Sequence, residues 1–149
     1  MTLRRARVLP VLLGLGVAAP AGAQEACPPG VPLNVNGAPA AVTFPAISRE
    51  HFAEGSVQAP SPISVTVTSG HPWHLCLAIG GDPSAAPRLE WSEDGRVWRS
   101  LGEQSFVAAS RPAGSAVPVT LLLRMRLSWR DDPQGRRTST LLFAAVPQP

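Results

Sequence analysis

Two histidines three positions apart, His71 and His74, are the closest pair of side chains with metal-binding chemistry in the sequence. Imidazole nitrogens are common ligands of zinc and related ions. On an extended strand, residues i and i+3 point to opposite faces, so one ion would require a bend at Pro72. His51 is distant in sequence, and no carboxylate accompanies the pair. We therefore expect a structural role for these histidines, with no metal and no cofactor.

Motifs that identify a reaction are absent from the sequence. No serine lies in a nucleophile-elbow motif, and the chain has no HExxH, phosphate loop or Cys-x-x-Cys pattern. The acidic residues are scattered, and the adjacent pair Asp131 and Asp132 is typical of a tight hairpin rather than of a calcium site. We predict that the chain is not an enzyme; an enzyme or a metal protein is the third hypothesis.

Trp98, Arg124 and Arg126 are the candidate ligand-binding residues. Alternation places Trp91 and Trp129 on inward positions, whereas Trp98 is out of phase and is the best candidate for an exposed, sugar-stacking ring. Alternate residues of a strand lie about 7 Å apart, so Arg124 and Arg126 would form a basic stripe suited to an anionic surface polymer. The alternative is a solvated face on which these arginines pair with neighbouring strands.

The first 23 residues have the pattern of a cleaved signal peptide. Residues 1–7 carry three arginines and no acid, residues 8–19 are mostly apolar, and Ala-Gly-Ala at 21–23 is a small-x-small cleavage site. The apolar run is too short for a spanning helix, although an uncleaved anchor is the alternative. We expect export to the periplasm, cell surface or exterior, a mature domain of residues 24–149, and no membrane span in it.

The mature chain has no net charge. The leader contains three of the 13 basic residues and none of the 10 acidic ones, which leaves ten of each sign. The high isoelectric point therefore gives no argument for a nucleic-acid partner.

Cys27 and Cys76 are expected to form a disulfide, as is usual for a pair of cysteines in an oxidising compartment. Two free thiols are the alternative. Alternation directs Cys76 away from the face that carries Leu75 and Leu77. The bond would then fasten the N-terminal segment to the opposite face or to an edge of that strand.

The body of the chain predicts strands. Fifteen prolines follow the leader, which leaves few stretches suited to a helix. Residues 119–130 alternate apolar and polar side chains over twelve positions, and residues 92–98 contain an Asp-Gly hairpin signal. Residues 53–61 and 110–115 are expected to be exposed loops. Seven to nine strands in one antiparallel β-sandwich are predicted, at 63–68, 73–79, 89–92, 97–101, 105–109, 119–130 and 138–146, with 33–36 and 41–44 as weaker candidates.

Two short motifs resemble known families. The Ser-x-Asp-Gly-x-x-Trp pattern of residues 92–98 resembles a hairpin of secreted β-sandwich modules, some of which bind carbohydrate. Residues 129–143, with Trp, then Pro-x-Gly and an alternating strand, resemble the last hairpin of pilin-like and spore coat protein U-like domains, although Arg137 stands where tyrosine is usual. This resemblance implies an immunoglobulin-like or pilin-like sandwich that assembles by strand addition, with the last strand as a donated or accepting edge.

The first hypothesis is therefore an exported, non-catalytic envelope or surface protein that acts as a structural or interaction module. Its expected partners are other envelope proteins or surface polymers. The second hypothesis is a carbohydrate- or envelope-polymer-binding module. An unpaired apolar edge strand would favour the first hypothesis, and an exposed Trp98 beside polar side chains would favour the second.

Overall fold

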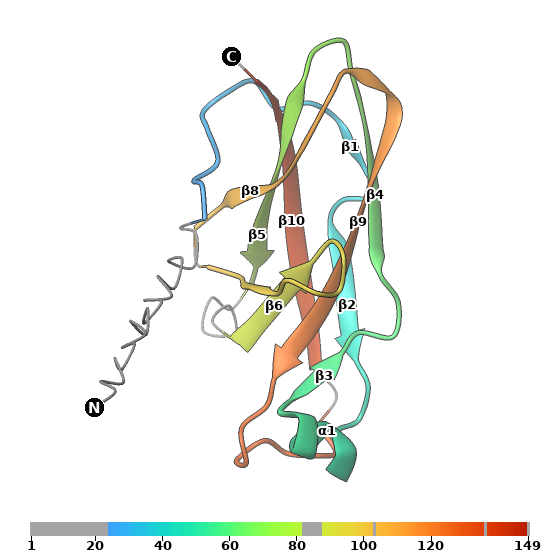
Figure 1. Ribbon diagram of the computed structural model, residues 1–149, viewed down its shortest axis with the longest axis vertical. Helices are drawn as coiled ribbons and strands as arrows, with labels where there is room; N and C mark the ends of the chain where they lie inside the picture. Colours follow the sequence, from blue (N-terminus) through green and yellow to red (C-terminus); the bar gives the residue numbers. More distant parts are fainter. Residues whose placement is uncertain (1–23, 82–87, 103, 136, 149) are drawn as a thin grey trace, which may run out of the picture.

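A computed structural model describes residues 24–81, 88–102, 104–135 and 137–148. They form two antiparallel β-sheets packed face to face, which confirms the predicted all-β sandwich (Figure 1). The expected signal peptide, residues 1–23, lies outside the described residues. No helix in the described part of the chain is long and apolar enough to cross a membrane.

The first sheet has six strands in the order β1-β4-β9-β6-β7, with β3 pairing with β9 as well. Its centre is β9, which pairs with β4 and β3 on one side and with β6 on the other. Its strands are β1 (Val35–Asn36), β3 (Ser56–Gln58), β4 (Ile63–Ser69), β6 (Leu89–Ser92), β7 (Arg99–Ser100) and β9 (Gly114–Arg126).

The second sheet has four strands in the order β2-β10-β5-β8. The last strand, β10, is central, because it pairs with β2 on one side and with β5 on the other. The expectation that the last strand is an edge is therefore wrong. The strands are β2 (Ala40–Phe44), β5 (Trp73–Gly80), β8 (Phe106–Arg111) and β10 (Arg137–Pro147).

The core lies between the sheets and follows the alternation of the strands. Leu121 and Leu123 of β9 are fully buried, as the twelve-residue pattern predicted. Leu75 and Leu77 of β5 face them from the other sheet and are also fully buried. Because burying one leucine contributes about 1.5–3 kcal/mol, this shared apolar layer is the main source of stability.

The position of Trp129 corrects the sequence prediction. We expected an inward ring, but Trp129 is 81% exposed. The reason is that β9 ends at Arg126: the amide of Leu127 then donates to Gly55 O (2.8 Å), and the chain turns away from the sheet. The strand also begins earlier than expected, at Gly114, and β8 extends to Arg111, so that four of the six residues of the predicted 110–115 loop are strand.

Residues 53–61, which we expected to be an exposed loop, contain the end of a helix and a strand. The short helix α1 (Arg49–Glu54) is capped by Ser48, whose hydroxyl accepts a hydrogen bond from the amide of His51 (3.3 Å). The His51 ring accepts from the Ser48 amide (3.1 Å), which is the part that Glu or Gln plays in most capping boxes. Val57 of β3 then enters the core fully buried.

The predicted disulfide between Cys27 and Cys76 is present, with Cα atoms 5.7 Å apart. Cys76 pairs with Ala144 between the inward positions of β5, so its side chain points to the outer face of the sheet, as predicted.

Residues 26–33 form a strap across the outer face of the second sheet. At one end, Ala26 bridges to Phe106 of β8; at the other, Leu33 bridges to Ala145 of β10. The disulfide fastens the strap between these two points. The N-terminal segment is therefore part of the sandwich.

Candidate functional site

The turn between β6 and β7 is closed by Asp94. Its Oδ1 accepts hydrogen bonds from the amides of Arg96 (2.8 Å) and Val97 (3.0 Å) and from the Ser92 hydroxyl (3.0 Å). Gly95 has φ of 73°, a left-handed conformation that favours glycine. The Asp-Gly signal therefore predicted this turn for the right physical reason.

The hydrogen bonds to Asp94 also change its acidity. The amides of Val97 and Arg96, and then the Ser92 hydroxyl, favour the ionised carboxylate and lower the pKa of Asp94 from 3.8 to about 2. At any pH above about 4 the turn is therefore held by a fully charged acceptor.

The closed turn folds back over the outer face of β9. Gly95 packs so near Leu122 that a Cβ on the glycine would lie 3.2 Å from Leu122 Cδ1. Trp98 donates from Nε1 to Gly95 O (3.2 Å), which fixes its ring above β9. The Arg124 guanidinium then lies 4.3 Å from the centre of that ring.

Arg124 and Arg126 share one carboxylate. Glu90 is the register partner of Arg124, and Arg124 Nε donates to Glu90 Oε2 (2.6 Å). Arg126 Nε lies 3.8 Å from Glu90 Oε1. The structure thus brings together all three predicted candidates, Trp98, Arg124 and Arg126, around Glu90; we call these four residues the Glu90 cluster.

Glu90 was not among the predicted site residues, although the sequence contains a signal for it. Residues 89–92 read Leu-Glu-Trp-Ser, and a single acid in a short apolar strand next to an arginine-bearing strand indicates a cross-strand ion pair. The missing information was the register that sets Glu90 opposite Arg124.

The geometry of the Glu90 cluster limits what it can bind. Arg124 occupies one face of the Trp98 ring, so a sugar cannot stack there. The Glu90 side chain is 10% exposed and offsets one of the two arginine charges. Arg126, with 57% of its side chain exposed, is the member most accessible to an anionic ligand.

His71 and His74 make different contacts. His74 Nδ1 lies 2.7 Å from the Ser110 hydroxyl of β8, whereas the Ser69 hydroxyl donates to the main-chain carbonyl of His71 (2.7 Å). Among the residues with described positions, no three His, Cys, Asp or Glu side chains gather to hold a metal ion.

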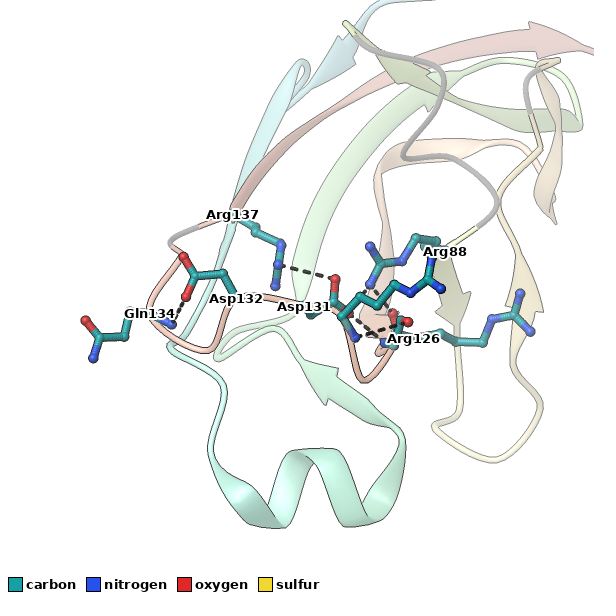
Figure 2. Close-up of polar contacts among 8 residues, drawn as sticks. Arg88, Arg126, Asp131, Asp132, Gln134 and Arg137 are labelled. Atoms are coloured by element: carbon teal, nitrogen blue, oxygen red, sulfur yellow. Dashed lines mark hydrogen bonds and ion pairs between the residues drawn. The ribbon is translucent and has the colours of Figure 1, made fainter.

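A second polar cluster surrounds Asp131, whose side chain is 7% exposed. Arg88 donates to Asp131 Oδ2, and Arg137 Nη2 lies 3.4 Å from Oδ1 on the other side (Figure 2). The amide of Ser128 also donates to Oδ2 (2.6 Å). Asp132 accepts from the amide of Gln134 (2.9 Å), so both acids hold turns of the β9–β10 connection. The predicted hairpin is wrong, because β9 and β10 lie in different sheets and this connection crosses between them.

The pKa of Asp131 reflects opposing effects. Burial raises it, but the hydrogen bonds from Ser128 and Arg88 and the charges of Arg88 and Arg137 together lower it below its ordinary value. The carboxylate is therefore charged at neutral pH and serves as the anchor of the β9–β10 connection.

The outer edge of β2 is the other feature with functional meaning. In the described part of the chain, β2 pairs with β10 alone, and its sequence Ala-Ala-Val-Thr-Phe contains no charge. A shallow groove separates this edge from residues 59–63 of the facing sheet, and Ala41 and Thr43 line it.

Fold and surface together define an all-β sandwich with a stapled N-terminal strap and an open, uncharged edge strand. Comparison of the chain with protein-family models, with curated proteins and with solved structures found no match.

Proposed function

We propose that the protein is an exported, non-catalytic interaction module of the cell envelope that joins other envelope proteins through the edge of β2. The observation that carries this proposal is the unpaired, uncharged β2 edge. Natural sheets protect such edges with charges, bulges or covering segments, because an open edge pairs readily with another chain. Prolines flank β2, but the five residues between them carry no charge and no described segment pairs with their outer edge, so this stretch is suited to accept a partner strand.

The surroundings of β2 favour one added strand. Pro39 and Pro45 flank the strand, so pairing would be confined to five residues. The groove beside β2 is lined across from the edge by Pro60 and Pro62, which have no amide hydrogen to compete for the incoming backbone. A partner strand would hydrogen-bond to β2 and place alternate side chains in this groove.

Export is supported by two features. The Cys27–Cys76 disulfide fastens the strap, and disulfides persist in oxidising compartments such as the periplasm or the cell exterior. The leader-like residues 1–23 are consistent with this location.

The test is to cross-link intact cells of the native host, extract the protein without denaturant, and measure its native size and its cross-linked partners. We expect a complex larger than the monomer with cross-links near β2. Ala41→Lys adds a charge at the edge and should release the monomer. Thr120→Lys, an exposed position on the outer face of the other sheet, is the matched control and should leave the complex intact. A monomer in the wild-type extract would refute the proposal.

The second candidate function is binding of a carbohydrate or envelope polymer at the Glu90 cluster. It is favoured by the convergence of Trp98, Arg124 and Arg126 on one surface. It ranks second because Arg124 covers a ring face and Glu90 offsets part of the charge. Loss of glycan binding in Trp98→Ala, with native size unchanged, would support it over the β2 proposal.

A further inference from the structure

The β9–β10 connection presents an aromatic ring on a closed turn. Trp129 and Arg130 are the two central residues of a turn whose ends are Ser128 and Asp131. The amide of Asp131 donates to Ser128 O (2.9 Å), and the amide of Ser128 donates to the Asp131 carboxylate (2.6 Å). At the tip, Trp129 is 81% exposed, far more than the buried Trp73 and Trp91.

The base of this turn is held from several directions. Arg88, which precedes β6, donates both to the Asp131 carboxylate and to Arg126 O (3.0 Å) at the end of β9. Arg137, the first residue of β10, reaches the same carboxylate. Figure 2 shows Arg88 and Arg137 on either side of Asp131. A turn fixed in this way presents its tip with little conformational freedom to lose on binding.

The two tip residues form one composite surface. The Arg130 guanidinium lies 4.8 Å from the centre of the Trp129 ring. Since Trp129 is 81% exposed, the ring face opposite Arg130 is open to solvent. An open apolar face and a group with five hydrogen-bond donors and a permanent positive charge thus lie on the two sides of one ring.

We propose that this Trp129–Arg130 turn binds a glycan that carries carboxylate groups. One sugar ring would stack its C–H face on the open side of Trp129, and the carboxylate of an adjoining sugar would pass the edge of the ring to bond to the Arg130 guanidinium on the other side. The site is separate from the β2 edge, so the inference stands whether or not strand addition occurs there.

Two other occupants fit the turn less well. An apolar pocket of a protein would have to strip water from the guanidinium that lies on the ring, which is costly. A membrane of anionic lipid would be attracted by a cluster of basic residues. At this end of the domain, which also carries α1 (Figure 1), acidic and basic residues nearly balance, so it offers no strong positive field. The basic residues are Arg49, Arg88, Arg126, Arg130 and Arg137, and the acidic residues are Glu50, Glu54, Asp131 and Asp132.

Affinity electrophoresis of the protein expressed from the full-length gene tests the inference. The gels contain alginate, hyaluronate or polygalacturonate at physiological ionic strength, with dextran as the neutral control. We expect at least one carboxylated glycan to retard the wild type. Trp129→Ala should then bind about tenfold or more weakly, and Arg130→Gln should lose affinity for the carboxylated glycan. Both positions are exposed, so melting temperatures should be unchanged.

Trp98→Ala is the matched control and should bind as the wild type does. If none of the three glycans retards the wild type, or if Trp129→Ala is retarded equally, the inference is wrong. Loss of binding in Trp98→Ala but not in Trp129→Ala would also overturn it, and would place the glycan at the Glu90 cluster. Loss of the β2-dependent complex in Ala41→Lys would leave this inference unaffected.

Discussion

Arg124 lies directly opposite Glu90 in the register of β9 and β6, and its Nε donates to Glu90 Oε2 at 2.6 Å beneath the turn that carries Trp98. The Glu90 side chain is 10% exposed and that of Arg124 is 31% exposed. The pair therefore links two strands and the turn above them, in a place where removal of one partner leaves a poorly solvated charge.

Arg124→Ala should destabilise the protein by about 1–2 kcal/mol, because Glu90 then keeps the longer contact with Arg126 but loses its short hydrogen bond. Urea unfolding measures the effect. Arg96→Ala, on the exposed surface of the turn, is the control and should change stability by less than about 0.5 kcal/mol. Equal effects of the two substitutions would contradict the assigned role of the pair.

Asp94→Asn should reduce stability at neutral pH but not in strong acid. The folded-state pKa of about 2 lies below the ordinary value of 3.8, so the ionised carboxylate stabilises the fold at higher pH. This contribution is lost as the pH falls from about 4 to about 2, through the folded-state pKa. Thermal melts of both proteins across this interval should converge; a constant gap would argue against ionisation as the cause.

Replacing both cysteines, Cys27→Ser with Cys76→Ser, should cost about 4 kcal/mol, from the chain entropy of a loop that spans 49 positions. Urea unfolding with and without reductant checks this value. Reductant should lower the stability of the wild type and leave the double variant unchanged. A wild type that is insensitive to reductant in the unfolding transition would refute the stabilising role of the strap.

Asp131→Asn should destabilise by about 2 kcal/mol, since it keeps an acceptor for the Ser128 amide but removes the charge between Arg88 and Arg137. Because the pKa of Asp131 is lowered, the loss should shrink as the pH falls below the ordinary carboxyl range. The adjacent, exposed Asp132→Asn is the control and should have a small effect. Chemical denaturation of both at several pH values decides the matter.

Two tryptophan substitutions should differ sharply. Trp91 is 2% exposed and stacks on Phe106 with ring centres 5.6 Å apart. Trp91→Ala should therefore lower the free energy of unfolding by about 3–5 kcal/mol. Trp129→Ala should change stability by less than about 0.5 kcal/mol, because the ring packs outside the core. Differential scanning calorimetry compares them, and similar melting temperatures would contradict the exposed position of Trp129.

Most strands could be predicted from the sequence because each has one buried face and turn residues at its ends. The pattern of residues 119–130 located the core face of β9 correctly, with Leu121 and Leu123 inside. The same pattern placed Trp129 wrongly, because apolar and polar residues continue to alternate in the sequence after the strand has ended at Arg126. Strand β3 was missed, since three residues with one buried valine give no periodic signal.

The candidate site was predicted only in part. Trp98, Arg124 and Arg126 were identified from residue type and strand face, and the structure brings them together. The ion pairs of Glu90 with Arg124 and of Asp131 with Arg88 were not identified, because the partners lie 34 and 43 positions apart in the chain.

The sequence alone determined what depends on neighbouring residues: the alternating strands, the Asp-Gly turn and the availability of two cysteines for one bond. The tertiary structure decided the strand order, which makes β10 central and leaves β2 at an edge. It also decided which charges meet and which tryptophan reaches solvent. These properties depend on register and sheet packing between distant segments, and such contacts leave no periodic trace in a single chain.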